Sequence, residues 1–302
     1  MAFTAKDVQA LREKTGVGMM DCKKALTEAG GDMEKAVDLL REKGLAAAAK
    51  KSGRIAAEGI VYAVSDERGG VVVEVNAETD FVAKNEDFQA FVKTVAETIL
   101  NESPADVDAL LKLKAAGSGM TVEELLREKV LTIGENIKIR RFERYEGVVS
   151  NYIHGGGRIG VMVRFDAPEN VAAEDEFAVL AKDIAMQIAA ANPSYLDKAS
   201  VPDEVLEKEK KILTEQAVNE GKPVQVAEKI VAGRIGKYFK ENCLVEQLFI
   251  KDNDLTVAKY LEAKSKELGG DITVTAFARF EKGEGLQKRE DNFAEEVSGM
   301  IK

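Results

Sequence analysis

The sequence predicts an α+β protein with antiparallel sheets, and three observations support this fold class. A segment of two strands followed by a helix occurs twice, 90 residues apart. The N-terminal part before the first copy has helical periodicity only. Proline is scarce, with 5 among 302 residues, and charged residues reach 32%, a composition that favours helices with solvated faces. The length is typical of two or three domains.

The N-terminal residues 4–42 predict a compact three-helix head. Thr4 can cap the first helix, and Asp7 three residues later supplies the acidic partner of a capping box. Glycines separate the three helices, at Gly16, Gly18, Gly30 and Gly31. The segment that follows the head, from Gly44 to Arg54, is expected to form a short helix or a hinge. A unit of about 40 residues is near the lower limit for independent folding.

The repeat predicts two β-hairpins. Residues 70–77 resemble residues 160–167, and each segment follows another strand, at 59–64 and 147–153 respectively. A glycine-containing turn joins the strands of each pair, which is typical of a hairpin. An apolar helix follows each hairpin, at 86–100 in the first copy and 174–191 in the second.

A third strand also repeats, and its spacing reveals an insertion. Residues 137–143 resemble residues 274–281, with Arg141 matched to Arg279 at a spacing of 138. This spacing exceeds the 90 residues of the hairpins by 48, so the second copy contains about 48 additional residues. Two helices joined by a Gly/Pro turn lie there, at 203–218 and 225–239, and predict an antiparallel hairpin. An interaction element and a passive spacer both fit this insertion.

The predicted organisation therefore has five parts. They are a head and linker at 1–55, a first α+β subdomain at 56–145, a second α+β subdomain at 146–201 and 246–284, an inserted helical hairpin at 202–245, and a C-terminal helix at 285–302.

Charge and composition narrow the function classes. Lys and Arg number 43 against 53 Asp and Glu, a net charge of −10, which argues against direct binding of nucleic acid. No run approaches the roughly 18 apolar residues that a membrane span needs. Cys22 and Cys243 are far apart and have no neighbouring cysteine or histidine, so neither a disulfide nor a zinc site is expected. We expect a cytoplasmic protein.

The sequence offers no chemistry typical of an enzyme. The sole histidine, His154, lies in a glycine-rich turn with no Ser or Cys partner at a catalytic spacing. The glycine run 155–160 joins two strands, whereas a dinucleotide-binding loop joins a strand to a helix. We therefore predict no catalytic residue, no metal and no cofactor, and a binding protein in place of an enzyme. An enzyme with an unrecognised site is the disfavoured alternative.

One segment after the first hairpin points to a binding surface. Thr79 and Asp80 can fix a tight turn through hydrogen bonds from side chain to backbone. Phe81 follows them and is matched to the smaller Val171 of the second copy. Its ring fits either of two places, beneath its own loop or outward as an aromatic anchor of the kind found at interface hot spots.

Four motifs identify a family. Residues 15–26, 79–85, 133–137 and 154–161 closely resemble, in the same order, motifs of the bacterial elongation factor Ts family, although the turn after His154 has three glycines in place of a shorter run. The resemblance covers essentially the whole chain, and the motifs together are highly specific. Members of this family are nucleotide exchange factors for the GTPase elongation factor Tu. The chain is therefore expected to bind the GDP-bound GTPase and to promote GDP release and GTP exchange.

The resemblance also implies roles for individual residues. It implies a head of the ubiquitin-associated type that docks on the GTPase through Arg12, Met19 and Met20. It places Thr79, Asp80, Phe81 and Val82 in the segment that dislodges the partner's magnesium ion, with Phe81 as the wedge. His154 is implied to touch the partner, the insertion to be a coiled coil, and the second subdomain to reach the partner's other domains.

Two questions stay open at this point. The runner-up function is an adaptor or scaffold, in which the head binds some other protein and the repeat is a platform. Self-association is also open, including a homodimer within a larger complex.

Overall fold

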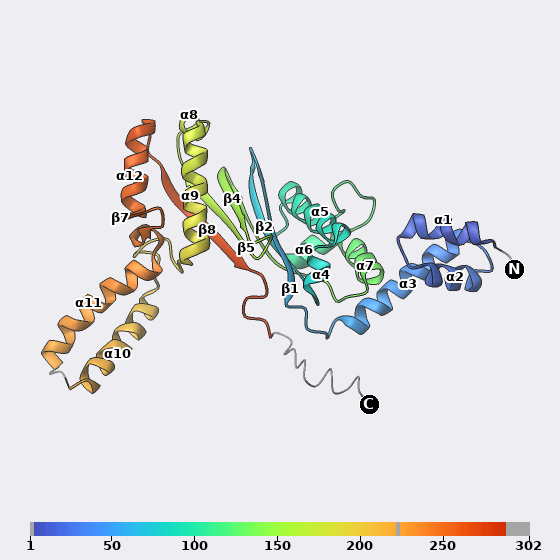
Figure 1. Cartoon of the computed structure of the whole chain (residues 1–302), viewed down its shortest axis with the longest axis horizontal. Coiled ribbons are helices and arrows are strands. Elements are labelled where there is room, and N and C mark those ends of the chain that lie inside the picture. The colour runs from blue at the N-terminus through green and yellow to red at the C-terminus, as the bar shows by residue number, and fades with distance from the viewer. Residues whose placement is uncertain (1–2, 222–223, 288–302) are drawn as a thin grey trace.

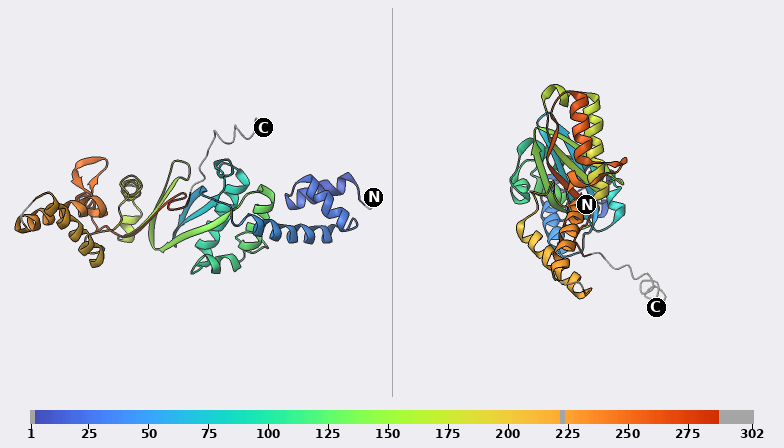
Figure 2. Two further views of the ribbon diagram at one scale, coloured as in Figure 1. Left: turned by 90° about the horizontal axis from the view of Figure 1, so that it is seen from below. Right: turned by 90° about the vertical axis from the view of Figure 1, so that its left-hand side faces the viewer.

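The structure is a computed structural model and describes residues 3–221 and 224–287. The molecule is elongated, with the N-terminal head at one end and a pair of long helices at the other (Figures 1 and 2). Two sheets and their covering helices form the body between them. Most of the predicted C-terminal helix, residues 288–302, lies outside the described residues.

The head consists of α1 (Ala5–Thr15), α2 (Met19–Glu28) and α3 (Met33–Lys51). The predicted capping box is confirmed, since the Thr4 amide donates to the Asp7 carboxylate at 2.6 Å and the Asp7 amide donates to Thr4 Oγ1 at 3.4 Å. Of the two forms predicted for the segment up to Arg54, a short helix or a hinge, helix is observed, but as a continuation of α3 without a break through Gly44 to Lys51. Four consecutive alanines after this glycine favour helix, and Gly44 itself packs closely against Leu131.

The two predicted hairpins are confirmed, and each gains a third strand to form an antiparallel sheet. The orders are β1-β2-β3 and β4-β5-β8. The bounds are β1 (Glu58–Asp66), β2 (Gly69–Ala77), β3 (Lys138–Glu146), β4 (Val148–His154), β5 (Ile159–Asp166) and β8 (Thr273–Glu281). The predicted α+β class with antiparallel sheets is thus confirmed.

The two sheets pack face to face, and helices cover their outer faces (Figure 2). Helix α5 (Glu86–Glu102) covers the first sheet and α9 (Asp175–Ala191) covers the second. Strand β2 is therefore buried on both faces along its whole length. A small apolar layer fills the space between the sheets and is made of Val61, Val72, Met162, Ala278 and Phe280.

The close approach of the sheets explains Gly160 of β5. A Cβ atom at this position would collide with Val61 Cγ1 of the facing sheet and lie 3.2 Å from Val72 Cγ2. Glycine thus allows the two sheets to meet without a gap.

Several elements were not predicted or differ in their bounds. Five elements were not predicted, namely α6 (Val107–Lys112), α7 (Val122–Ile133), β6 (Leu248–Phe249), β7 (Asp252–Thr256) and α12 (Val257–Leu268). The inserted helices are α10 (Asp203–Asn219) and α11 (Val224–Asn242), which pack side by side (Figure 1) and are followed by the short helix η1 (Leu244–Glu246). Two single-turn helices, α4 (Asp80–Ala83) and α8 (Glu169–Ala172), follow the hairpins.

The strand pairing corrects the predicted spacing of the third strand. Gly69 of β2 faces Glu146 of β3, and Ile159 of β5 faces Glu281 of β8. The third strands are therefore related by 135 residues, not by 138, and Arg279 corresponds to Arg144 in place of Arg141. The second copy is longer than the first by 45 residues, the difference between 135 and 90. Side chains of a strand alternate between its two faces, so a shift by three residues, an odd number, moves each side chain to the opposite face. The predicted match therefore put inward-facing side chains on the outward face.

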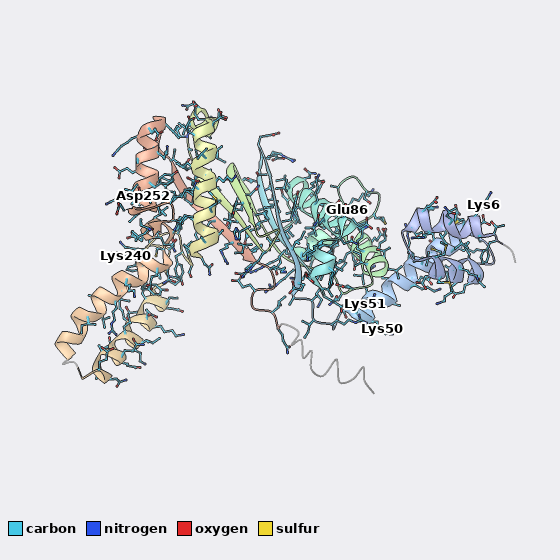
Figure 3. All side chains as sticks on the ribbon, viewed as in Figure 1. Lys6, Lys50, Lys51, Glu86, Lys240 and Asp252 are labelled. Carbon is cyan, nitrogen blue, oxygen red and sulfur yellow. The ribbon has the colours of Figure 1, made fainter. Side chains whose placement is uncertain are left out.

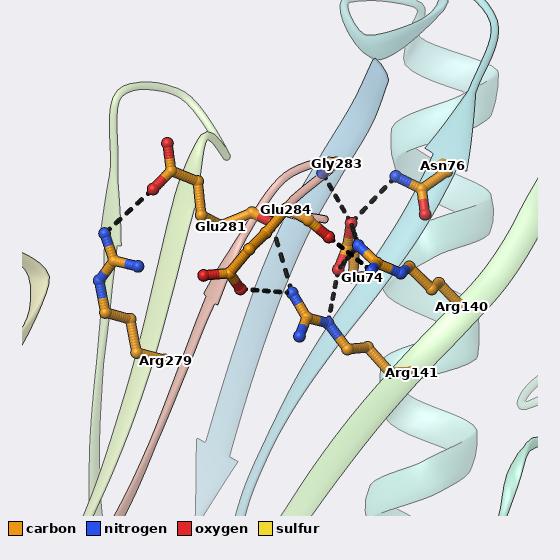
Figure 4. A network of polar contacts seen from close by, with 8 residues as sticks. All are labelled: Glu74, Asn76, Arg140, Arg141, Arg279, Glu281, Gly283 and Glu284. Atoms are coloured by element: carbon orange, nitrogen blue, oxygen red, sulfur yellow. Dashed lines mark hydrogen bonds and ion pairs between the residues drawn. The ribbon is translucent and has the colours of Figure 1, made fainter. Parts of the chain in front are cut away.

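A buried carboxylate ties the two sheets together (Figure 4). Glu74 of β2 is fully buried and binds Arg140 at 3.0 Å and Arg141 at 2.7 Å. It also accepts hydrogen bonds from the Asn76 side chain and from the backbone N–H of Gly283, just beyond β8. Burial raises the pKa of Glu74, but these donors outweigh it and hold the pKa below its ordinary value of 4.5.

Charged side chains are distributed along the whole molecule. Figure 3 labels Lys6 on the head, Glu86 at the start of α5 and Lys240 on α11, at successive positions along the long axis. Within the residues that the structure describes, no helix combines the length and apolar character that crossing a membrane requires. The same residues contain no group of three or more His, Cys, Asp or Glu arranged to hold a metal ion.

Candidate functional site: an exposed partner-contact surface

The turn after β2 separates two adjacent apolar side chains. Thr79 caps α4, with its Oγ1 accepting a hydrogen bond from the Val82 amide at 3.5 Å. The Phe81 side chain is 78% exposed, whereas Val82 is 8% exposed and packs in the core beneath α5. Of the two places predicted for the ring, the outward one is therefore observed. Val82 supports the turn from inside and does not lie on its exposed face.

The structure corrects the match between Phe81 and Val171. Helices α4 and α8 are equivalent and are related by 89 residues, so Val82 corresponds to Val171 and Phe81 corresponds to Asn170. Both valines are buried, at 8% and 0% exposure. The first copy therefore carries an exposed aromatic ring where the second copy carries a polar side chain.

Asp80 acts differently from the prediction. Its carboxylate was expected to bond the backbone of the turn, but its principal partner is Lys84, one helical turn later, at 3.0 Å. The hydrogen bond from Lys84 and the charge of that lysine lower the pKa of Asp80. Lys84 also lies 6.0 Å from the centroid of the Phe81 ring. Because water screens an exposed ion pair of this kind, it contributes little to stability.

Glu135 fixes the turn from outside. It belongs to the motif at 133–137, but no role was predicted for its side chain. One carboxylate oxygen accepts hydrogen bonds from the backbone amides of Glu78 and Thr79, each at 3.0 Å. The other accepts from Thr79 Oγ1 at 2.6 Å. In return, Glu78 accepts from the Asn136 amide at 2.6 Å. Glu135 is 56 residues from Thr79 in sequence and is one of 53 acidic residues, so its local sequence does not show that it reaches this turn.

The head contributes a second exposed apolar group. Met19 and Met20 begin α2 and are 45% and 63% exposed, and Arg12 on α1 is also exposed. The end of α1 approaches the Phe81 turn, because Gly16 and Phe81 line one hollow of about 330 Å³. The residue that ends α1 and the exposed ring thus border the same hollow, together with Thr132 of α7.

His154 lies exposed at the end of β4, with its Nδ1 3.0 Å from the Tyr152 hydroxyl. The turn that follows packs on β1, where the Val61 amide donates to the Gly157 carbonyl at 2.8 Å. Gly157 has φ +95°, and a Cβ there would lie 2.9 Å from Ile60 Cβ. Since Ala77 pairs with the first residue of β1 and Gly157 bonds Val61 three residues later, the Phe81 turn and the His154 hairpin both lie towards the start of this strand.

The pair of inserted helices is remote from this surface. Helices α10 and α11 extend from the opposite end of the molecule (Figure 1). The insertion thus lies apart from the Phe81 turn, the His154 hairpin and the head.

These features define a protein whose candidate site is a contact surface, with apolar side chains exposed on a rigid frame. Comparison with known proteins gives the family. The family model described as "Elongation factor TS" matches residues 78–284. A protein named "Elongation factor Ts" from Clostridium perfringens is 57% identical over 303 residues, which cover 99% of each chain. Proteins of the same name from Clostridium novyi and Clostridium botulinum are 55% and 53% identical, over 99% of this chain and 98% of their own.

The chain belongs to the elongation factor Ts family. Membership of this family gives its general function, which is that of a translation elongation factor with a role in nucleotide exchange.

Proposed function

We propose that this protein binds the GDP-bound GTPase elongation factor Tu, dislodges its magnesium ion and so promotes GDP release and GTP exchange. Family membership supports the partner. The observation that carries the proposal is the 78% exposure of Phe81 on a turn held by hydrogen bonds from three donors to Glu135. A rigid exposed ring is suited to enter a partner, since little entropy is lost when it binds.

The proposed mechanism needs binding energy and no catalytic acid or base. GTPases of this kind hold the nucleotide through backbone contacts to the phosphates and a bridging magnesium ion. An exchange factor binds the nucleotide-free state more tightly than the loaded state, and by linkage the nucleotide weakens the factor equally. Loss of the ion leaves phosphate charge unscreened and loosens the nucleotide.

Phe81 alone is too small to drive exchange. Burying one phenylalanine yields about 1.5–3 kcal/mol, and each tenfold acceleration requires about 1.4 kcal/mol. We propose that the head, as a docking unit of the ubiquitin-associated type, supplies further energy through Arg12, Met19 and Met20. His154 and the second subdomain would add contacts with other parts of the partner, and α10 with α11 would form the coiled-coil motif.

The domain boundaries, the cytoplasmic location and the absence of a nucleic-acid partner belong to the same proposal. Three functional units would be separable in this view: the head at 1–55, the first subdomain at 56–145 that carries the wedge, and the second subdomain at 146–201 and 246–284. The hairpin at 202–245 and the segment at 285–302 would be additions to this frame. A homodimer within a larger complex is compatible with this arrangement.

Stopped-flow release of a fluorescent GDP from elongation factor Tu tests the proposal. Phe81→Ala should slow the stimulated release at least tenfold, and Asp80→Ala should slow it less, by loosening the Lys84 contact. Val179→Ala is the matched control, because Val179 is 59% exposed on the opposite outer face of the body. If Phe81→Ala stimulates GDP release as fast as the wild type does, Phe81 is not the wedge. Binding of the wild type without any acceleration would favour the adaptor.

A further inference from the structure

The internal repeat provides a comparison for the Glu135 contact. Helices α7 and α12 are related by 135 residues, as are the strands β3 and β8 that follow them. Both helices end at a glycine with positive φ, Gly134 at +85° and Gly269 at +70°. The next residue is Glu135 in the first copy and Gly270 in the second. The two positions are structurally equivalent, but only the first has a carboxylate.

The turns that these residues face also differ. Thr79 caps α4, and its equivalent before α8 is Pro168. Proline has no backbone N–H and no hydroxyl, so it cannot donate to a carboxylate. Gly270 lies directly against this turn, and a Cβ there would be 3.0 Å from Pro168 Cγ and 2.7 Å from Val171 Cγ2. At this position the second copy therefore packs a glycine against its turn, where the first copy has a carboxylate that accepts hydrogen bonds from the turn.

The carboxylate and the exposed ring occur together. The first copy has Glu135, Thr79 and the exposed Phe81, and the second has Gly270 and Pro168 with Asn170 in place of the ring. Closing a turn of this shape does not require a carboxylate, since α8 forms without one. Both copies have the turn, but the carboxylate contact is found only in the copy that has the exposed ring.

Glu135 is also connected to the head. It follows α7, which packs along α3 of the head. Lys51 at the end of α3 donates to the Val130 carbonyl of α7 at 3.3 Å. Thr132 of α7 and Gly16 of the head line the hollow beside Phe81. The carboxylate that holds the ring-bearing turn therefore extends from the helix on which the head rests.

We infer that Glu135 is a positioning residue for Phe81, which holds the turn so that docking of the head places the ring at a fixed point on the partner. This inference rests on the proposed function. Glu135 does not touch the partner in this scheme and acts only through the orientation of the Phe81 turn.

Glu135→Gln keeps the size of the side chain but removes its charge and replaces one acceptor oxygen with an NH2 group. Either the amides of Glu78 and Thr79 then face this NH2 group, or the Thr79 hydroxyl must turn from donor to acceptor. The saturating rate of stimulated GDP release should fall about tenfold, because hydrogen bonds to charged groups are among the stronger ones. The matched control is Glu102→Gln on α5, since Glu102 is exposed and makes no side-chain hydrogen bond or ion pair with any described residue. Release should be unchanged in this control.

The double variant separates positioning from general damage. In the Phe81→Ala background, Glu135→Gln should change the release rate less than twofold, because there is no ring left to position. Equal slowing in both backgrounds would overturn the inference. If Glu135→Gln releases GDP at the wild-type rate while Phe81→Ala releases it slowly, the inference about Glu135 would be overturned and the proposed function would stand. If Phe81→Ala itself releases GDP at the wild-type rate, both the proposed function and the inference would be refuted.

Amide hydrogen exchange gives a readout that does not depend on the GTPase. In Glu135→Gln the amides of Glu78 and Thr79 should exchange at least tenfold faster than in the wild type. The amide of Ser103, which donates to Ile99 within α5, should keep its protection. Unchanged protection of Glu78 and Thr79 would overturn the inference, and loss of protection at all three sites would show unfolding in place of a local effect and overturn it also.

Discussion

The carboxylate of Glu74 accepts a hydrogen bond of 2.8 Å from the backbone N–H of Gly283, which lies 209 residues further along the chain. Glu74 belongs to the central strand of the first sheet, and Gly283 follows the last strand of the second (Figure 4). The two repeated copies are therefore joined through a buried charge as well as through the apolar layer between their sheets.

Replacing Glu74 should destabilise the whole protein. Glu74→Ala leaves Arg140 and Arg141 without their buried partner and the Gly283 amide without its acceptor, and breaking such a group costs about 3–5 kcal/mol. Urea unfolding followed by circular dichroism measures this loss. Glu143→Ala on the neighbouring strand β3 is the control, since this side chain is exposed and should change stability by about 0.5 kcal/mol or less. Equal urea midpoints for the two variants would contradict the stabilising role of Glu74.

The same carboxylate predicts a dependence of stability on pH. The pKa of Glu74 is below its ordinary value of 4.5 in the folded protein. Its contribution is therefore fully present above pH 4.5 and is lost as the pH falls below 4.5 and through the folded pKa. Glu74→Gln lacks this titration, so the stability difference between it and the wild type should shrink as the pH falls from 5 towards 3. A difference that stays constant over this range would be the contrary result.

Adjacent residues of the Phe81 turn should respond differently to truncation. Phe81→Ala should leave the melting temperature unchanged, because the ring is 78% exposed. Val82→Ala removes buried carbon atoms beneath α5 and should destabilise the protein by about 1.5 kcal/mol or more, at roughly 0.8 kcal/mol per buried CH2. Differential scanning calorimetry of the two variants distinguishes them. A large fall in melting temperature for Phe81→Ala would mean that the ring packs against this chain.

The two cysteines should be unreactive in the folded protein. Cys22 and Cys243 are both buried, and burial raises the pKa of each thiol. The thiolate is the reactive form, so an aromatic disulfide reagent should react at neutral pH only as the protein unfolds. The absorbance of the aromatic thiolate that the reagent releases, followed with and without denaturant, measures how fast the two cysteines react. Rapid reaction of one thiol in native buffer would show local opening at Cys22 in the head or at Cys243 beside α11.

Sequence patterns predicted those parts of the fold that local interactions determine. Thr4 and Asp7 are three residues apart, and the two hairpins contain their own turns, so neighbouring residues suffice to specify them. Helices α5 and α9 follow from their apolar faces alone. The outcome differs for the third strand of each sheet, where similarity of Arg141 to Arg279 suggested a match that the pairing of β3 and β8 corrects.

The candidate site was predictable only in part. Exposure of Phe81 could not be deduced from composition, because both of its possible positions satisfied the local pattern. Glu135 reaches the turn from a different element, and only the fold brings a carboxylate at the end of α7 against the amides of Glu78 and Thr79. Long-range contacts of this kind have no periodicity in the sequence that could identify them.

The unbroken helix α3 has a geometric consequence. Because each residue of a helix advances it by about 1.5 Å and turns it by about 100°, the length of α3 sets both the distance and the angle at which the head is held. One residue inserted near Lys43 would rotate the head about the helix axis and turn Gly16 away from Thr132. The chain could still fold, but Met19 and Met20 would face a new direction while Phe81 kept its own, and a single partner could no longer meet both.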